Sequence, residues 1–250
     1  MKKTPVYDSS HVLISNRIAR EFNNPLGAAA LTLLRHLLPQ TGSFRVLDAG
    51  CGKGAASSYW ARSGAAAIHA FDPSEDMLQT ARETLSRTAP AACTVTFENA
   101  TLESFHTEEQ YDIIVLHDVL CYTANPLKTA EKFLNYLKPG GIASISDYWN
   151  DKSSTAVDRI TKAWNISKPV QFHAWDAVPE GYKQLLHADT TRQYSEHWQE
   201  CRNKVEQLRE TLIAEAGKNP VHDYEAKIQS IQSAVATGSF GHHWLLIAKT

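Results

Sequence analysis

Three closely spaced glycines, Gly50, Gly52 and Gly54, begin two residues after an acid, Asp48, and could form a ligand-binding loop. A glycine lets a ligand approach the backbone closely because it carries no Cβ. A second acid, Asp72, comes about 20 residues after the loop, where its carboxylate could accept hydrogen bonds from ribose hydroxyls. This combination predicts a site for an adenosine-containing ligand.

The spacing of the glycines and the charge beside them narrow the choice of ligand. The dinucleotide fingerprint is GxGxxG, whereas these glycines are spaced two and two, and the phosphate-loop pattern GxxxxGK[ST] is absent. The carboxylate of Asp48 would repel a pyrophosphate but attract the α-ammonium group of S-adenosylmethionine, which carries no phosphate. We therefore expect S-adenosylmethionine as the cofactor. A nicotinamide cofactor, and with it an oxidoreductase, is the disfavoured alternative.

The elements that must position these residues follow from an alternation of apolar strands and helices. We expect strands over residues 44–48, 65–71, 94–97, 111–116, 142–145 and 244–248. The alternation predicts an α/β fold with a doubly wound, mostly parallel sheet and helices on both faces. Ligands of such sheets bind at the carboxyl ends of the strands. This sequence places there Asp48–Gly54, Asp72, Asn99, Ala100, His117–Tyr122 and Asp147–Trp149.

The chain divides into four segments by pattern. We expect an N-terminal helical cover over residues 1–43, a cofactor-binding core over 44–149, an inserted helical and aromatic substrate cap over 150–237, and a terminal strand within 238–250 that returns to the sheet. A cover and a cap of this size favour an enclosed pocket. The expected substrate is therefore a small molecule.

Composition excludes several other classes of protein. Of 250 residues, 43% are hydrophobic, which is enough for a folded core. The 25 basic and 27 acidic residues leave a net charge of −2, so binding of nucleic acid by bulk electrostatics is disfavoured. No stretch approaches the roughly 20 apolar residues of a membrane span. The four cysteines and 11 histidines lack metal-ligand or disulfide spacing. We expect a cytoplasmic monomer or homodimer with no metal and no membrane contact.

Four segments in order resemble the motifs of class I S-adenosylmethionine-dependent methyltransferases. They are Val46–Gly54, Phe71–Leu78, Tyr111–Val115 followed by Val119 and Leu120, and Leu137–Gly141. The resemblance implies a seven-stranded sheet whose last strand is antiparallel, and an enzyme that transfers a methyl group. The segments Ile145–Trp149 and Tyr194–Trp198 are similar to small-molecule enzymes of the phosphoethanolamine N-methyltransferase type.

The same resemblance implies roles for individual residues. Gly50 and Gly52 would lie along the methionine part of the cofactor, with Asp48 at its ammonium group and Asp72 at the ribose. The remaining expected cofactor contacts are Pro73 and Met77 beside the adenine, Asn99 and Ala100 at its edge, the His117 carbonyl near the sulfonium, and Tyr122.

Methyl transfer is an in-line displacement that needs a general base only if the acceptor carries a proton. His117, Asp118, Tyr122, Asp147 and Tyr148 lie at the expected mouth of the pocket, and we select His117, Asp147 and Tyr148 as catalytic candidates. The expected substrate contacts are Tyr7, His11, Trp149 and Trp175.

Several alternatives stay open from the sequence. Asp147 and Tyr148 could instead cap the end of a strand. The aromatic residues Trp164, Phe172, Trp175, Tyr182, Tyr194 and Trp198 could form either a cage for a cationic or planar substrate or the core of the cap. The acceptor atom could be oxygen, nitrogen or carbon, and the chain could also be a cofactor-binding partner or regulator without catalysis.

Overall fold

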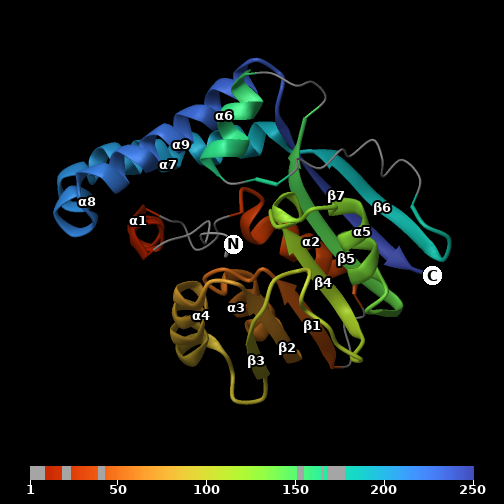
Figure 1. Cartoon of the computed structure of the whole chain (residues 1–250). Helices are drawn as coiled ribbons and strands as arrows, with labels where there is room; N and C mark the ends of the chain where they lie inside the picture. The colour runs from red at the N-terminus through yellow and green to blue at the C-terminus, as the bar shows by residue number, and fades with distance from the viewer. Residues whose placement is uncertain (1–8, 19–23, 39–42, 151–154, 165, 168–177) are drawn as a thin grey trace.

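The computed structural model describes residues 9–18, 24–38, 43–150, 155–164, 166–167 and 178–250. In this part of the chain, seven strands form one sheet in the order β3-β2-β1-β4-β5-β7-β6 (Figure 1). The strands are β1 Phe44–Ala49, β2 Ala65–Asp72, β3 Thr94–Asn99, β4 Tyr111–His117, β5 Leu137–Trp149, β6 Tyr182–Asp189 and β7 Gly241–Lys249. Strands β1 to β5 run parallel to one another, and β7 is antiparallel to both β5 and β6.

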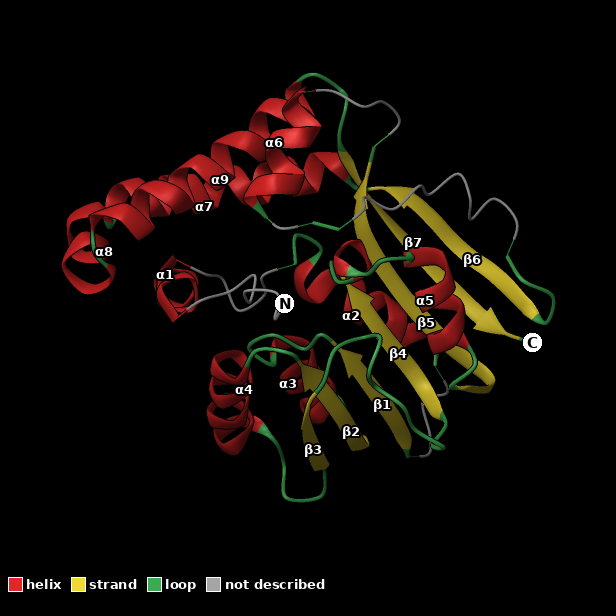
Figure 2. Ribbon diagram, viewed as in Figure 1, coloured by secondary structure: helices red, strands yellow, loops and turns green. Residues whose placement is uncertain are grey.

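Helices lie on both sides of this sheet and beyond its carboxyl edge (Figure 2). Their bounds are α1 Ser9–Ile18, α2 Gly27–Leu37, α3 Ala55–Arg62, α4 Glu75–Thr88, the short 3-10 helix η1 Leu120–Tyr122, α5 Pro126–Leu134, α6 Thr155–Ala163, α7 Thr191–Gln207, α8 Arg209–Ala216 and α9 Lys218–Ala236. Among the described residues, no helix combines the length and apolar character that a membrane crossing requires.

Apolar side chains bury both faces of the sheet. On one face, Phe133 of α5 packs with Phe71 and Phe105. On the other face, Leu34 of α2 and Trp60 of α3 pack with residues of β1, β2 and β4. Because the central strands are covered on both sides, they read as continuous apolar runs in the sequence rather than as an alternating pattern.

Helices α6 to α9, which we call the helical cap, extend past the carboxyl ends of the strands (Figure 1). They have their own apolar core, to which Trp164 just after α6, Trp198 of α7 and Ile228 of α9 contribute. Ile14 and Ile18 of α1 pack into the same core. The N-terminal helix therefore closes against the cap, and the two together face the edge of the sheet where a ligand is expected.

The fold class predicted from the sequence is confirmed, including the antiparallel terminal strand. One strand was not located in advance: β6, at residues 182–189, lies inside the range predicted as an inserted cap. It is an edge strand that pairs only with β7 among the described residues, and most of its side chains are partly or fully exposed. Without a buried face it carries little of the apolar pattern by which a strand is predicted.

Candidate functional site

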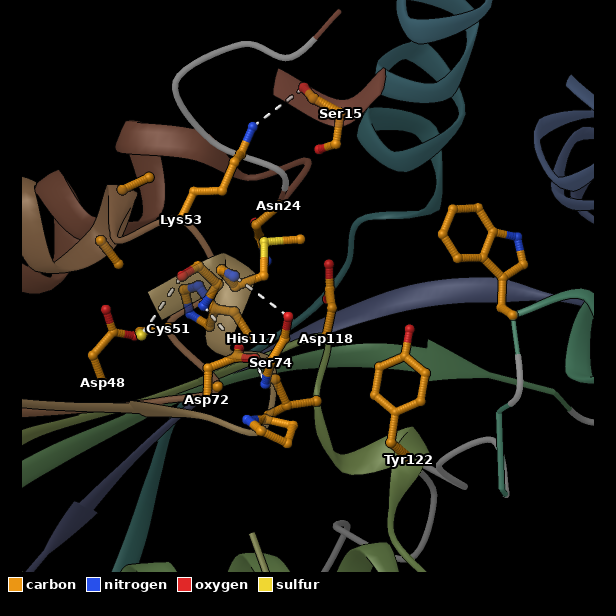
Figure 3. A pocket seen from close by; sticks show the side chains of 18 of the residues that line it. Ser15, Asn24, Asp48, Cys51, Lys53, Asp72, Ser74, His117, Asp118 and Tyr122 are labelled. Atoms are coloured by element: carbon orange, nitrogen blue, oxygen red, sulfur yellow. Dashed lines mark hydrogen bonds between the residues drawn. The ribbon is translucent and has the colours of Figure 1, made fainter. Parts of the chain in front are cut away.

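A cavity of about 610 Å³ lies between the carboxyl edge of the sheet, α1 and the helical cap. Its size falls within the range of about 300–1,000 Å³ that ligand pockets occupy. Residues far apart in the sequence meet there because the carboxyl ends of β1, β2, β4 and β5 are in register: Ala49 pairs with both Phe71 and Leu116, and His117 pairs with Ser146. Figure 3 shows the polar side chains that line it.

The glycine loop lines this cavity, and its first two glycines differ in the space around them. Both have positive φ angles, +70° for Gly50 and +51° for Gly52. A Cβ on Gly50 would lie 2.4 Å from Cγ1 of Val119, whereas a Cβ on Gly52 would meet no atom within 4 Å. Gly50 therefore allows the loop after β4 to pack closely, and Gly52 leaves open space for a ligand.

Asp72 connects the loop to the second strand. Its Oδ2 accepts the backbone N–H of Gly52 at 3.0 Å, and its Oδ1 accepts that of Ser74 at 2.9 Å. Ser74 in turn caps α4 by accepting the N–H of Met77 at 3.3 Å. Burial raises the pKa of Asp72 to about 6. The carboxylate is thus held at the cavity wall with lone pairs left for a ribose.

Asp48 lines the cavity at the end of β1 and is almost fully buried. Its Oδ2 accepts the hydroxyl of Ser57 in α3 at 2.5 Å, and the backbone N–H of Ser57 also donates to the carboxylate. Burial raises the pKa of Asp48 to about 6. An ammonium group in the cavity would offset the free-energy cost of burying the carboxylate by pairing with its charged form.

The predicted adenine contacts divide into two groups. Pro73 and Met77 line the cavity. Asn99 and Ala100 do not: the Asn99 amide donates to the Pro73 carbonyl and to Glu75, and Ala100 packs into the sheet core. The cavity is instead lined by the next three residues, Thr101, Leu102 and Glu103. Contact of Asn99 and Ala100 with the adenine stays a prediction that the lining of this cavity does not support.

His117 lines the cavity, but its ring is not set up as a base. Its Nε2 lies 2.8 Å from Oγ of Ser144, which also accepts the indole N–H of Trp244 at 2.9 Å. Which atom donates in the contact between Nε2 and Oγ depends on the tautomer of the ring, because the hydroxyl oxygen has two lone pairs and can accept from both rings. Burial lowers the pKa of His117 to about 4, which makes it a weak proton acceptor near neutral pH.

Asp147, a second catalytic candidate, does not line the cavity. It is fully buried, and its two oxygens accept the backbone N–H groups of Cys121 at 3.1 Å and Tyr148 at 2.8 Å. These bonds tie η1 to the end of β5. The strand-end role considered as the alternative therefore agrees with its placement, and the catalytic one does not.

The third candidate, Tyr148, does reach the cavity, while its neighbour Trp149 does not. The Tyr148 ring lies against Tyr194 and Phe240, with centroids 5.3 and 5.6 Å away, and burial keeps the pKa of its phenol well above the usual value. Trp149 points to the opposite face of β5, because successive strand residues alternate, and packs on His243. Trp149 is therefore not in a position to contact a substrate in this cavity.

Asp118 is an acid at the cavity wall whose backbone and side chain are both held in place. It is the only described non-glycine residue with a positive φ, +58°. Its Oδ1 accepts a hydrogen bond from Nε2–H of His242 at 2.8 Å and another from the hydroxyl of Ser146 at 3.1 Å. His242 is fully buried, and its Nδ1 lies 2.6 Å from Oγ1 of Thr190. Strained backbone of this kind clusters at functional sites. A chain of hydrogen bonds therefore fixes a carboxylate at the cavity wall.

Aromatic rings from α1 and the cap enclose the far side of the cavity. The ring of His11 lies 5.7 Å from that of Trp164 and 5.0 Å from that of Tyr224, and Trp164 lies 5.0 Å from Trp198. All four line the cavity, as does Tyr122. The two tryptophans thus belong to the core of the cap and to the cavity wall at once.

The other aromatic candidates lie elsewhere. Tyr194 is buried behind the cavity wall, and Tyr182 stands on β6 beside Asn135 and Lys249. Tyr7, Phe172 and Trp175 lie outside the described residues. No group of three or more histidine, cysteine or acidic side chains is placed to hold a metal ion in the part of the chain that the structure describes.

Comparison with known proteins agrees with this geometry. The profile of a family described as "Methyltransferase domain" matches residues 40–217. Phosphoethanolamine N-methyltransferase 3 of Arabidopsis thaliana is 26% identical over 250 residues, which cover 97% of this chain and 50% of that protein. A ubiquinone biosynthesis O-methyltransferase of Cereibacter sphaeroides is 29% identical over 164 residues, covering 65% of this chain and 61% of that protein.

A solved structure extends the likeness to the whole fold. Phosphoethanolamine N-methyltransferase 2 of Haemonchus contortus superposes with a TM-score of 0.83 at 20% identity, covering 98% of this chain and 58% of that one. The chain spans half the length of the Arabidopsis relative and little more than half of the Haemonchus protein. At this identity the superposition establishes a shared fold.

Proposed function

The chain belongs to the family of class I S-adenosylmethionine-dependent methyltransferases, and from this premise we propose that it methylates the amine nitrogen of a small molecule. One observation carries the choice of nitrogen: the cavity holds a carboxylate, Asp118, that the fold fixes by a strained turn and by the buried His242. An anionic group beside aromatic walls suits a basic amine better than a neutral hydroxyl or carbon.

Residues at the cavity wall fit the cofactor that this family uses. When bound, S-adenosylmethionine supplies a methyl carbon on a positively charged sulfur. Asp72 would hold the ribose hydroxyls, and Pro73 and Met77 would flank the adenine. Gly52 leaves the loop backbone open, and Asp48 would pair with the ammonium group.

Asp118 would act on the acceptor in two ways. Its charge and its free lone pairs would bind the ammonium form of an amine, and the carboxylate would then accept the proton that must leave before nitrogen becomes nucleophilic. His242, held by Thr190, keeps the carboxylate in place. The rings of Trp164, Trp198 and Tyr148 would exclude water around the reacting nitrogen.

The relatives named phosphoethanolamine N-methyltransferases support nitrogen as the acceptor atom and make phosphoethanolamine one compound to test. We propose a small molecule rather than nucleic acid because rings of α1 and the helical cap cover one side of the cavity and the net charge is −2. Cytoplasmic location and a monomeric or homodimeric state stay predictions.

The test uses the methyl-labelled donor and a panel of small-molecule amines that includes phosphoethanolamine. Asp118→Asn is the informative variant, because asparagine tolerates a positive φ and keeps an oxygen for His242 while removing the charge. We expect kcat to fall about 100-fold or more, with the affinity for S-adenosylhomocysteine unchanged. Asp223→Asn, an exposed acid on α9, is the matched control.

Two results would contradict the proposal. Full activity of Asp118→Asn would show that its carboxylate does not serve the acceptor. Binding of the cofactor product without labelling of any amine or of any metabolite in a cell extract would favour the cofactor-binding partner or regulator considered from the sequence.

A further inference from the structure

Helix α7 places a thiol and an imidazole together on the cavity wall. His197 and Cys201 are four residues apart, so their side chains lie on the same face of the helix. Nε2 of His197 lies 3.7 Å from Sγ of Cys201, which is within hydrogen-bond reach for sulfur. Both residues line the cavity and are buried, with 4% and 7% of their surface exposed. A nucleophile and a base in contact are the pair that covalent chemistry needs, and the proposed methyl transfer uses neither.

A lysine of the glycine loop brings positive charge to the same part of the cavity. Lys53 lines the cavity, and its Nζ donates to the backbone carbonyl of Ser15 in α1 at 3.3 Å (Figure 3). Burial lowers the pKa of Lys53 to about 8, and the thiol of Cys201 opposes this fall. The sulfur and the ammonium group are therefore near enough for their charges to interact, and a nearby cation stabilises a thiolate.

The other three cysteines, all in the described part of the chain, have surroundings that oppose ionisation. Cys51 also lines the cavity, but burial and then the carboxylate of Asp48 raise its pKa well above the usual value. Burial and a neighbouring carboxylate do the same for Cys121. Burial also raises the pKa of Cys93, which lies just before β3 and is partly exposed. Of the four thiols, Cys201 is the one that contacts an imidazole on the cavity wall.

We propose that Cys201 is a nucleophilic thiol, activated by His197, and that small α,β-unsaturated carbonyl compounds modify it when they enter the cavity. This covalent site goes beyond methyl transfer and does not depend on which acceptor the enzyme uses.

The addition needs only the thiol, the imidazole and the electrophile. The thiol proton moves to Nε2 of His197, and Sγ of Cys201 forms a bond to the β carbon of the compound. The π electrons of the C=C bond move toward the carbonyl oxygen, whose negative charge the ammonium group of Lys53 stabilises. The α carbon then takes the proton from His197. No group leaves, and no oxidant or reductant takes part.

The walls beside the thiol favour a small, flat and uncharged compound. The indole of Trp198 adjoins the ring of His197, with centroids 5.4 Å apart, and Trp164 lies 5.0 Å from Trp198. Aromatic walls of this kind suit a planar π system. An adduct on Cys201 would occupy part of the cavity of about 610 Å³ and hinder other ligands there.

The test follows all four thiols of the folded full chain by mass spectrometry during reaction with acrylamide, a small neutral probe. Cys201 should be labelled about tenfold faster or more than Cys51 and Cys121, which are also buried but have acidic neighbours. Cys93 is the reference for a partly exposed thiol. A maleimide joined to a polyethylene glycol chain, which is too large for the cavity, should label Cys93 and leave Cys201 unlabelled.

The variant His197→Gln removes the base and keeps a polar side chain. It should slow labelling of Cys201 about tenfold or more, while the rate at Cys93 stays that of the wild type. His36→Gln, at an exposed histidine on α2, is the matched control and should leave the rates at all thiols unchanged.

Two results would overturn the proposal. Labelling of Cys201 only on unfolding, together with Cys51 and Cys121, would show that the thiol is not accessible from the cavity. Equal rates at Cys201 in His197→Gln and the wild type would show that the imidazole does not activate it. If His197→Gln does not fold, the comparison among the wild-type thiols still decides. A chain that is labelled as expected but methylates no amine would refute the proposed function alone.

Discussion

Alanine substitutions at Gly50 and Gly52 should separate the packing role of the glycine loop from its ligand-binding role. Both residues have positive φ, so alanine at either position costs roughly 1–2 kcal/mol of backbone strain. Only at Gly50 does the new Cβ collide, 2.4 Å from Cγ1 of Val119, and overpacking of this kind adds about 1–3 kcal/mol. The expected losses in the free energy of unfolding are therefore about 2–5 kcal/mol for Gly50→Ala and about 1–2 kcal/mol for Gly52→Ala.

Denaturant unfolding measures these losses, and the double variant Gly50→Ala/Val119→Ala provides the control. Removing both Cγ atoms of Val119 leaves only its Cβ, 3.3 Å from the new methyl group, so most of the collision should disappear. The two substitutions should then couple by about 1–3 kcal/mol. Gly52→Ala should instead weaken binding of S-adenosylhomocysteine about tenfold or more, because its methyl group enters the open cavity.

The reasoning would be refuted by either of two results. Gly52→Ala could be destabilised as much as Gly50→Ala, which would mean that strain alone sets the cost. Alternatively, Val119→Ala could add to Gly50→Ala without coupling, which would mean that the two side chains do not meet.

Two further predictions concern the acids at the strand ends. Burial raises the pKa of Asp147 from 3.8 to about 7, so between these pH values the folded chain keeps a proton that the unfolded chain releases. The contribution of Asp147 to the free energy of unfolding should therefore fall by roughly 1.4 kcal/mol per pH unit as pH rises through this window. Asp147→Asn should flatten the measured slope, and an unchanged slope would contradict the assignment. His242→Gln should lower kcat/KM for the amine about tenfold, as expected for loss of a residue that positions a catalytic group, while S-adenosylhomocysteine affinity stays near wild type. Loss of the folded state with an unchanged kcat/KM of the folded fraction would indicate a purely structural role.

The sequence was sufficient for most of the sheet and for bringing the glycine loop and the two acids Asp48 and Asp72 to one cavity. Strands β1, β2 and β4 are short apolar runs that end in or beside polar residues, and parallel strands must bring such ends to one edge. Asp48, Gly52, Asp72, Pro73 and Met77 were therefore placed correctly at the cavity wall. Their positions follow from local spacing, because each comes from the end of a strand, the loop after it or the first turn of the following helix; their roles toward the cofactor stay predictions.

The side of the cavity that we propose for the acceptor was decided only by the tertiary structure. Asp118 and Asp147 both stand at strand ends, and nothing in their neighbours along the chain distinguishes them. The two acids differ in their hydrogen-bond partners. His242, 124 residues away in the sequence, donates to Asp118, whereas backbone N–H groups donate to both oxygens of Asp147. Trp164, Trp198 and Tyr224 reach the cavity because α6, α7 and α9 fold back over the sheet edge. Spacing along the chain predicts contacts made within a loop or a single helix turn, whereas contacts between distant elements depend on how their buried faces pack.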